Sequence, residues 1–204
     1  MDTDIITIAN QKGGTGKSTL AINLAAGFAP HLKVCIADTD PQGSTSGLTG
    51  ILKQIDIVNL DDVLNAEIVD GYDLMIIDTP PYLTARLPEL FAVSDYVLIP
   101  TKAGFLDVMA IGATIKLLEQ TMATYKRVKA GIVLNMVMHR TSVTEEVRGI
   151  LRDTYKIPVL DTVIGQRISY TRSPLTSGVF NSEDEKAKGE LTALAAEIMQ
   201  QLDK

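Results

Sequence analysis

The residues with the clearest chemical meaning are two lysines on either side of a glycine-rich turn. Glycines let backbone N–H groups curl around phosphate oxygens, and the start of a following helix adds the positive end of its dipole. Lys17 would reach the β and γ phosphates, and Ser18 would offer its hydroxyl to Mg²⁺. The predicted phosphate-binding residues are Lys12, Gly13, Gly14, Thr15, Gly16, Lys17, Ser18 and Thr19.

Carboxylates follow two of the apolar runs in the sequence. Asp38 and Asp40 come at the end of the run 33–38, and Asp78 closes the run 74–78 in the manner of a Walker B motif. In open α/β sheets, ligands bind at the carboxyl ends of the strands. Mg²⁺ keeps several waters and needs only one or two carboxylates, so we expect Asp78 to hold the metal through water.

The elements that must position these groups alternate along the chain. Short, continuously apolar runs predict buried strands at 5–9, 33–38, 74–78, 96–100, 130–137 and, more weakly, 159–164. Segments of helical spacing predict helices at 18–28, 84–93, 107–122, 142–155 and 184–202. This alternation predicts an α/β fold, with a doubly wound, mostly parallel sheet flanked by helices on both faces. We expect a single P-loop domain over 1–204.

Composition excludes several other classes. No apolar stretch approaches the ~20 residues of a membrane-spanning helix, and the acidic residues Asp2 and Asp4 stand where a secretory signal would be basic. Cys35 is the only cysteine, so an internal disulfide, a zinc ribbon and a four-cysteine cluster within one chain are excluded. We therefore expect a cytoplasmic protein. Asp2 also lies almost on the first strand, which leaves no room for an N-terminal DNA-reading domain.

Charge is segregated along the chain. The whole sequence carries a formal charge of −6, but residues 126–172 hold nine Lys and Arg against four Asp and Glu. That segment therefore has a net charge of +5 and the remainder −11. A surface that binds a polyanion is expected within 126–172.

The phosphate-binding segment departs from the general pattern at one position. The pattern G-x-x-x-x-G-K-[ST] places glycine where this chain has Gln11, and a second lysine, Lys12, follows. This K-G-G-x-G-K-[ST] form resembles the ParA/MinD family of deviant Walker A ATPases. The run 8–14, which reads Ile-Ala-Asn-Gln-Lys-Gly-Gly, looks particularly like ParA.

The resemblance implies roles for individual residues. Lys12 would cross a homodimer interface and touch phosphates held by the other subunit, as an arginine finger does. The segment 38–42 matches the family motif D-x-D-P-Q, which makes Asp40 the residue that orients the attacking water and Asp38 a partner of the Mg²⁺ shell. In related ATPases the base is gripped after the later strands, which points to Asn135 and to the loop 165–167. The implied cofactors are ATP and Mg²⁺.

The resemblance extends over nearly the whole chain and favours short plasmid-type ParA proteins, through Gln166-Arg167, Val179-Phe180 and the run 187–190. It implies a partition ATPase whose ATP-bound dimer coats nucleoid DNA without sequence preference. A ParB-like partner on the cargo would stimulate slow, Mg²⁺-dependent hydrolysis and release the dimer. The candidate phosphate contacts to duplex DNA are Arg140, Arg148, Arg152, Arg167 and Arg172.

Three alternatives remain open at this stage. The same machine could position a protein cargo, such as a microcompartment or a chemoreceptor array. A MinD-like membrane-surface switch would need a basic amphipathic C-terminal helix, and the ending 196–204 is short and not basic. A metabolic ligase of the dethiobiotin synthetase kind would need its own substrate pocket, and 43–70 carries no sign of one. A nitrogenase-reductase relative is excluded because Cys35 lies in a strand.

Overall fold

The core of the molecule is a seven-stranded sheet in which every neighbouring pair of strands is parallel. The computed structural model describes residues 3–39, 45–59, 71–82, 84–138 and 142–202. The strand order is β3-β2-β4-β1-β5-β6-β7, which places β1 in the middle. The strands are β1 Asp4–Ile8, β2 Val34–Asp38, β3 Ile55–Asn59, β4 Leu74–Asp78, β5 Tyr96–Thr101, β6 Lys129–Val137 and β7 Val159–Gly165.

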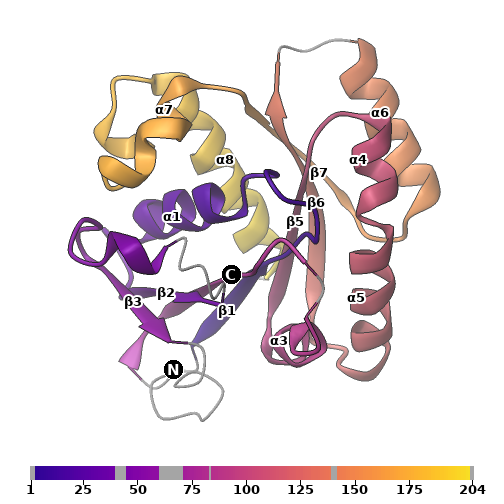
Figure 1. Cartoon of the computed structure of the whole chain (residues 1–204), viewed down its shortest axis with the longest axis horizontal. Coiled ribbons are helices and arrows are strands. Elements are labelled where there is room, and N and C mark those ends of the chain that lie inside the picture. Colours follow the sequence, from indigo (N-terminus) through magenta and orange to yellow (C-terminus); the bar gives the residue numbers. More distant parts are fainter. Residues whose placement is uncertain (1–2, 40–44, 60–70, 83, 139–141, 203–204) are drawn as a thin grey trace.

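Helices cover both faces of this sheet (Figure 1). One face packs against α1 Lys17–Phe28, α7 Ile168–Arg172 and α8 Glu185–Gln201. The other packs against α3 Leu87–Val93, α4 Phe105–Ala110, α5 Gly112–Thr124 and α6 Ser142–Thr154. The doubly wound architecture expected from the sequence is confirmed.

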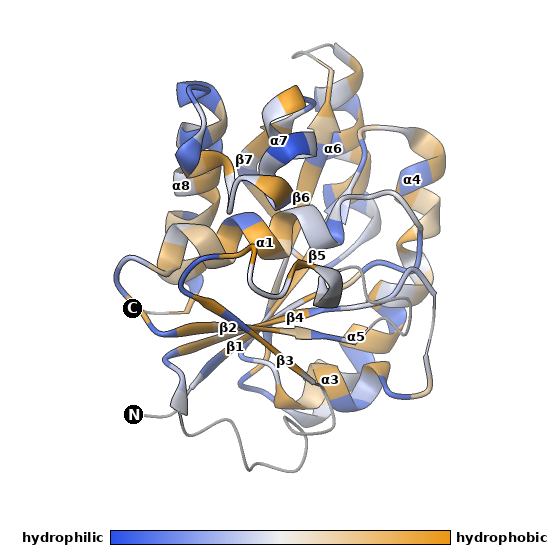
Figure 2. Ribbon diagram, turned by 60° about the vertical axis from the view of Figure 1, so that its left-hand side comes forward, coloured by the Kyte–Doolittle hydropathy of each residue, from blue (hydrophilic) through white to orange (hydrophobic). Residues whose placement is uncertain are grey.

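The inner strands β2, β4 and β5 are buried at every position, so most of their residues are apolar. Along β4, Met75 and Ile77 enter one core cluster while Leu74 and Ile76 enter the other. Successive side chains of a strand point to opposite faces, so a strand between two layers of helices is apolar on both faces along most of its length. Figure 2 shows this apolar character running along the strands.

Several elements differ from the sequence prediction. The edge strand β3 and the short helix α7 were not predicted. The single helix expected over 107–122 is two helices, α4 and α5, which part at Ile111. At the start of α5, a Cβ on Gly112 would meet the hydroxyl of Tyr155 at 3.1 Å, so α6 packs closely against this junction.

The last strand, β7, is irregular, and its backbone is satisfied by side chains. Its register with β6 shifts between Ile132 and Leu134. At this irregularity, Glu197 of α8 accepts hydrogen bonds from the N–H groups of Asp161 and Thr162 at 2.7 and 3.0 Å. Further along, Glu190 accepts one from the N–H of Gly165 at 3.1 Å. Carboxylates of α8 therefore occupy N–H groups of the last strand of the sheet.

None of the helices in the described part of the chain combines the length and the apolar character needed to cross a bilayer.

Candidate nucleotide-binding site

The glycine-rich loop joins the central strand β1 to helix α1. Gly14 and Gly16 have φ values of 68° and 88°, a region that residues with a Cβ rarely adopt. Gly16 is the N-cap of α1, and Lys17 is its first residue. The side chain of Lys17 is buried, while Ser18 and Thr19 in the first helical turn are half-buried. The loop thus has the backbone of a phosphate cradle at the positive end of a helix.

A buried amide holds this loop from the side. Asn135, at the carboxyl end of β6, is 4% exposed, and its Nδ2 donates to the carbonyl of Thr15 at 2.7 Å. Its Oδ1 accepts from the N–H of Met136, which has a φ of 55°. A Cβ on Gly16 would collide with this amide, so the glycine is required by the close approach as well as by its φ. Asn135 therefore contacts the phosphate loop directly.

The second lysine of the motif is paired within its own chain. Lys12 Nζ lies 2.7 Å from Asp107 Oδ1 of α4, with the lysine side chain 39% exposed and the aspartate 14%. Asn10 Oδ1 accepts the N–H of Lys12 at 2.8 Å, and Gln11 Nε2 donates to the carbonyl of Ala110 at 3.1 Å. The ammonium group of Lys12 thus stands at the surface beside the loop, bound to a partner 95 residues further along the sequence.

Two predicted metal carboxylates lie side by side next to the loop. Asp38 and Asp78 are register partners in the adjacent strands β2 and β4, and Asp78 also pairs with Ile8 at the end of β1. Both are buried, and Asp38 Oδ2 accepts the N–H of Thr45 at 2.9 Å. Asp40 lies outside the described residues.

This donor set fits Mg²⁺. No group of three His, Cys, Asp or Glu side chains gathers anywhere in the described ranges. Mg²⁺ does not need such a cage, because it is commonly held by one or two carboxylates together with phosphate oxygens and water. Buried carboxylate oxygens beside a phosphate cradle and the hydroxyl of Ser18 are ligands of the required hardness.

A small cavity of about 120 Å³ lies at the start of α1, next to the phosphate loop. Its lining includes Thr19 and Leu20 of α1, Asn135 and Met136 near the carboxyl end of β6, and Gly165, Gln166, Arg167 and Tyr170 from the end of β7 to α7. The sequence placed the base-binding residues after these two strands, and the structure brings Asn135 and the loop 165–167 together there.

Known proteins match this chain over most of its length. The profile of the CobQ/CobB/MinD/ParA nucleotide-binding domain matches residues 6–178. The chain belongs to this family. Within the ParA/MinD family, it is 30% identical to maintenance of carboxysome distribution protein A of Halothiobacillus neapolitanus, over 85% of this chain and 84% of the relative. It is also 30% identical to the chromosome-partitioning ATPase Soj of Thermus thermophilus, over 83% and 84% of the two chains.

Solved ParA/MinD structures share the fold. A plasmid partition protein from Borrelia burgdorferi superposes with a TM-score of 0.71 at 21% identity, covering 98% of this chain and 100% of that one. MinD of Pyrococcus horikoshii, solved with Mg-ADP, gives 0.70 at 19% identity, with 96% of each chain covered. McdA of Cyanothece, solved as an ATP complex of a variant, gives 0.79 at 14% identity over 97% and 96%.

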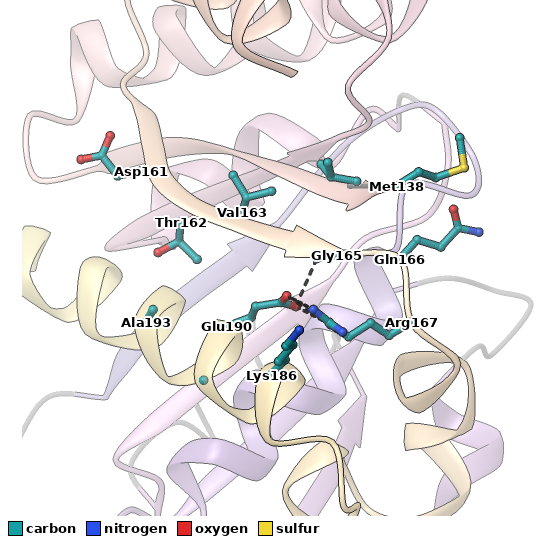
Figure 3. Close-up of a pocket in the computed structure, with 12 residues that line it drawn as sticks. Met138, Asp161, Thr162, Val163, Gly165, Gln166, Arg167, Lys186, Glu190 and Ala193 are labelled. Atoms are coloured by element: carbon teal, nitrogen blue, oxygen red, sulfur yellow. Dashed lines mark hydrogen bonds and ion pairs between the residues drawn. The ribbon is translucent and has the colours of Figure 1, made fainter. Parts of the chain in front are cut away.

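A wider groove of about 1110 Å³ lies between β7 and α8 of this ParA/MinD chain. Figure 3 shows Arg167 and Glu190 pointing toward one another along it. Arg167 Nη2 lies 2.7 Å from Glu190 Oε1, and this hydrogen bond raises the pKa of the guanidinium above its usual value. Tyr170 also donates to Glu190, at 3.0 Å, and burial raises the pKa of its phenol. Arg167 is thus committed to an internal network.

One of the five candidate DNA-binding arginines is misplaced by the sequence prediction. Arg148 is 6% exposed, and its guanidinium donates to the carbonyls of Leu160 and Asp161, where β7 loses register with β6. The positive charge of its segment made it a candidate, but the structure turns its side chain from α6 toward β7. A buried guanidinium that satisfies backbone carbonyls is not available to a DNA phosphate.

The other candidates differ in exposure. Arg172 is exposed on the last turn of α7. Arg152 is exposed on α6, with Nη2 3.2 Å from Asp161 Oδ1. Arg140 lies outside the described residues.

Sequence reasoning also missed functional neighbours of the loop. Asp107 and Asn10 hold the side chain and the backbone of Lys12, yet neither belongs to the phosphate-binding pattern. Asp107 had no signal, because it looks like any acid in the first turn of a helix. The signal for Asn10 was its place in the ParA-like run that leads into the loop.

Proposed function

We propose that this chain is a ParA-type ATPase that positions cargo through an ATP-controlled switch. In this proposal ATP joins two copies into a dimer that holds duplex DNA without sequence preference. A ParB-like or other cargo-bound partner then speeds a slow hydrolysis and releases the dimer. The observation that carries the proposal is a phosphate cradle with one buried lysine, Lys17, and a second one, Lys12, presented at the surface beside it.

The residues of this chain divide the chemistry among them. Lys17 and the loop N–H groups bind the phosphates, and Asn135 fixes the loop. Asp40 would orient the attacking water, and Lys12 of each copy would contact phosphates held by the other copy. Ser18, Asp38 and Asp78 would hold Mg²⁺, which neutralises charge on the phosphate oxygens when bound. The charges on both sides of the triphosphate would thereby come from two chains.

The basic segment supports the DNA part of the proposal. Arg152 and Arg172 are exposed and belong to the segment whose net charge is +5. Contacts from such residues to phosphates position a protein on DNA without reading its sequence. We therefore expect nucleoid association in the cytoplasm through the whole 204-residue domain.

A protein cargo is the second candidate. The relative named for carboxysome distribution matches this chain at the same identity, 30%, as the chromosome-partitioning ATPase Soj. The nucleotide switch is common to both readings, and only the cargo-bound partner differs. Proteins encoded by genes neighbouring this one can be tested for binding to this chain. A DNA-binding partner would indicate partition. A partner associated with a microcompartment shell or a receptor array would indicate a protein cargo.

Sedimentation of the purified chain tests the switch itself. We expect a monomer with Mg-ADP and a dimer with Mg²⁺ and a non-hydrolysable ATP analogue, with retardation of arbitrary duplex DNA only in the second state. A chain that stays monomeric at saturating analogue would refute the proposal. Dimers that leave duplex DNA unshifted at low salt would refute its DNA part.

A further inference from the structure

Three consecutive residues before the glycines are all bonded to one distant segment, residues 100–110. Asn10 Nδ2 donates to the carbonyl of Pro100 at 2.8 Å. Gln11 Nε2 donates to the carbonyl of Ala110 at 3.1 Å, and Lys12 Nζ lies 2.7 Å from Asp107 Oδ1. The segment comprises the end of β5 and the whole of α4. The entry to the phosphate loop is therefore attached to it at three points.

The first of these bonds also controls the backbone of the lysine. Asn10 is 2% exposed, and the amide that donates to Pro100 accepts the N–H of Lys12 at 2.8 Å through its Oδ1. One planar, buried group thus fixes the distance between the end of β5 and the Cα of Lys12. A lysine has four side-chain torsions, so the reach of its ammonium group depends strongly on where the backbone is held.

Helix α4 is itself anchored on its inner side. Val108 and Ile111 are buried, and the hydroxyl of Tyr155 donates to the carbonyl of Val108 at 2.8 Å. Tyr155 follows α6, so α4 is held between the phosphate loop and α6. A helix fixed in this way can serve as a rigid bracket for the residues bonded to it.

Gln11 occupies the position where the general pattern has glycine. A glycine there could not bond to Ala110, the last residue of α4. The carbonyls of the last helical turn have no partner within the helix, and the amide of Gln11 satisfies one of them. The substitution of glutamine for glycine therefore adds a fixed connection directly before the second lysine.

We infer that Asn10 and Gln11 are positioning residues that hold Lys12 for its action across the dimer, with residues 100–110 as their bracket. This inference rests on the proposed function, because it assigns no separate activity to these amides. The residues around the loop would then serve two different nucleotides. The glycines, Lys17 and Asn135 bind the nucleotide of the same chain, whereas Asn10 and Gln11 serve the partner's nucleotide through Lys12.

The deciding variant is Gln11→Met, which keeps the length of the side chain and removes its amide. The measurements are the affinity for a fluorescent ADP derivative and the protein concentration at half-maximal dimerisation with a non-hydrolysable ATP analogue. We expect ADP affinity within threefold of the unaltered chain and dimerisation weakened at least tenfold. Gln120→Met, on the exposed surface of α5, is the matched control and should change neither value.

Two further variants sharpen the test. Gln11→Gly restores the general phosphate-loop pattern and should also bind ADP normally and dimerise poorly. Asn10→Ala removes both bonds of the buried amide and should have the larger effect on dimerisation. Should Asn10→Ala fail to fold, the half-buried position of Gln11 keeps the test available.

Different outcomes would refute the positioning role of Asn10 and Gln11 and the proposed ATP-dependent dimerisation. An unaltered chain that never dimerises with the analogue refutes the proposed function. An unaltered chain that dimerises, with Gln11→Met dimerising equally well, overturns the inference alone. A Gln11→Met chain that loses ADP affinity by the same factor as dimerisation also overturns it, because the amide would then be shaping the whole cradle.

Discussion

The phosphate loop and the basic segment 126–172 were both singled out by their lysines and arginines, yet the structure uses the two sets differently. In the loop, Lys17 and Lys12 lie where their spacing placed them, one buried in the cradle and one beside it. In the basic segment, Arg148 supports backbone carbonyls of β7, and Arg167 is paired with Glu190. Only some of the excess positive charge of this segment therefore faces solvent.

A short motif and the net charge of a long segment contain different information about where side chains lie. A loop of eight residues fixes geometry through its own φ angles and the helix that follows it, so residue order implies position. Net charge over 47 positions is a sum that contains no direction. Whether an arginine faces solvent depends on packing against strands and helices far away in the sequence. Five substitutions test this contrast, beginning with the one that should weaken ligand binding most.

Replacement of the buried lysine should have the largest effect on ligand binding. In Lys17→Ala, the phosphates lose about two charge-assisted hydrogen bonds of roughly 2 kcal/mol each, which corresponds to about a 10³-fold loss of nucleotide affinity. Titration with a fluorescent ATP analogue measures it. Lys116→Ala, on the exposed surface of α5, is the control. If Lys17→Ala kept its ATP affinity within tenfold of the unaltered chain, the motif would not have placed Lys17 at the phosphates.

Removal of Lys12 should leave nucleotide binding unchanged and prevent ATP-dependent dimerisation and hydrolysis. Lys12→Ala should bind ADP normally, fail to dimerise with ATP and lose roughly 10³ to 10⁵ in hydrolysis rate, as removal of an arginine finger does. Sedimentation and phosphate release measure the two effects. Normal dimerisation and hydrolysis would contradict the role in trans.

Arg148 and Arg172 of the basic segment should respond in opposite ways, the first in stability and the second in DNA affinity. Arg148→Ala should lower the free energy of unfolding by about 3 kcal/mol, because backbone carbonyls in β7 lose a buried, charged donor. Its DNA affinity, corrected for the folded fraction, should not change. Urea unfolding and DNA retardation measure the two quantities.

Arg172→Ala should show the reverse behaviour. Stability should change by less than about 0.5 kcal/mol, as is usual for an exposed side chain. Affinity for arbitrary duplex DNA should fall severalfold, and the slope of its logarithm against log salt should decrease by about 1. A salt slope that does not change would remove Arg172 from the DNA surface.

The smallest expected effect concerns the N-cap of α8. Asp184 accepts from Ser169 Oγ and from the N–H of Ala187, and these hydrogen bonds lower its pKa below the ordinary 3.8. Its stabilisation, about 1 kcal/mol for an N-cap, is therefore complete above that value and is lost as pH falls through the lowered folded-state pKa. The gap in unfolding free energy between the unaltered chain and Asp184→Ala should shrink in acid. A gap that is constant with pH would contradict the assignment, and Asp153→Ala is an exposed control.

Much of the fold could be predicted because buried parallel strands appear in the sequence as continuous apolar runs. The edge strand β3 escaped because the exposed Asp56 interrupts its apolar run. The break between α4 and α5 escaped because Tyr155, which packs beside it, lies 43 positions from Gly112 in the sequence. Short-range patterns cannot contain such contacts.

The candidate site divides in the same way. Lys17, Asp38 and Asp78 follow from motif and strand ends, whereas Asp107 becomes a neighbour of Lys12 only after β5 has been placed beside β1. Arg148 was wrongly chosen because the net charge of a segment does not show which of its cations face solvent. Asp40 and Arg140 remain predictions.

The carboxylates with which α8 covers β7 set a boundary for engineering the protein. Exposed strand edges recruit further strands and promote aggregation. Shortening the C-terminal helix before Glu190 would uncover the N–H groups of Asp161, Thr162 and Gly165 together. Truncated versions would thus expose backbone groups that promote aggregation, so tags and fusion joints belong after the end of α8, beyond Gln201.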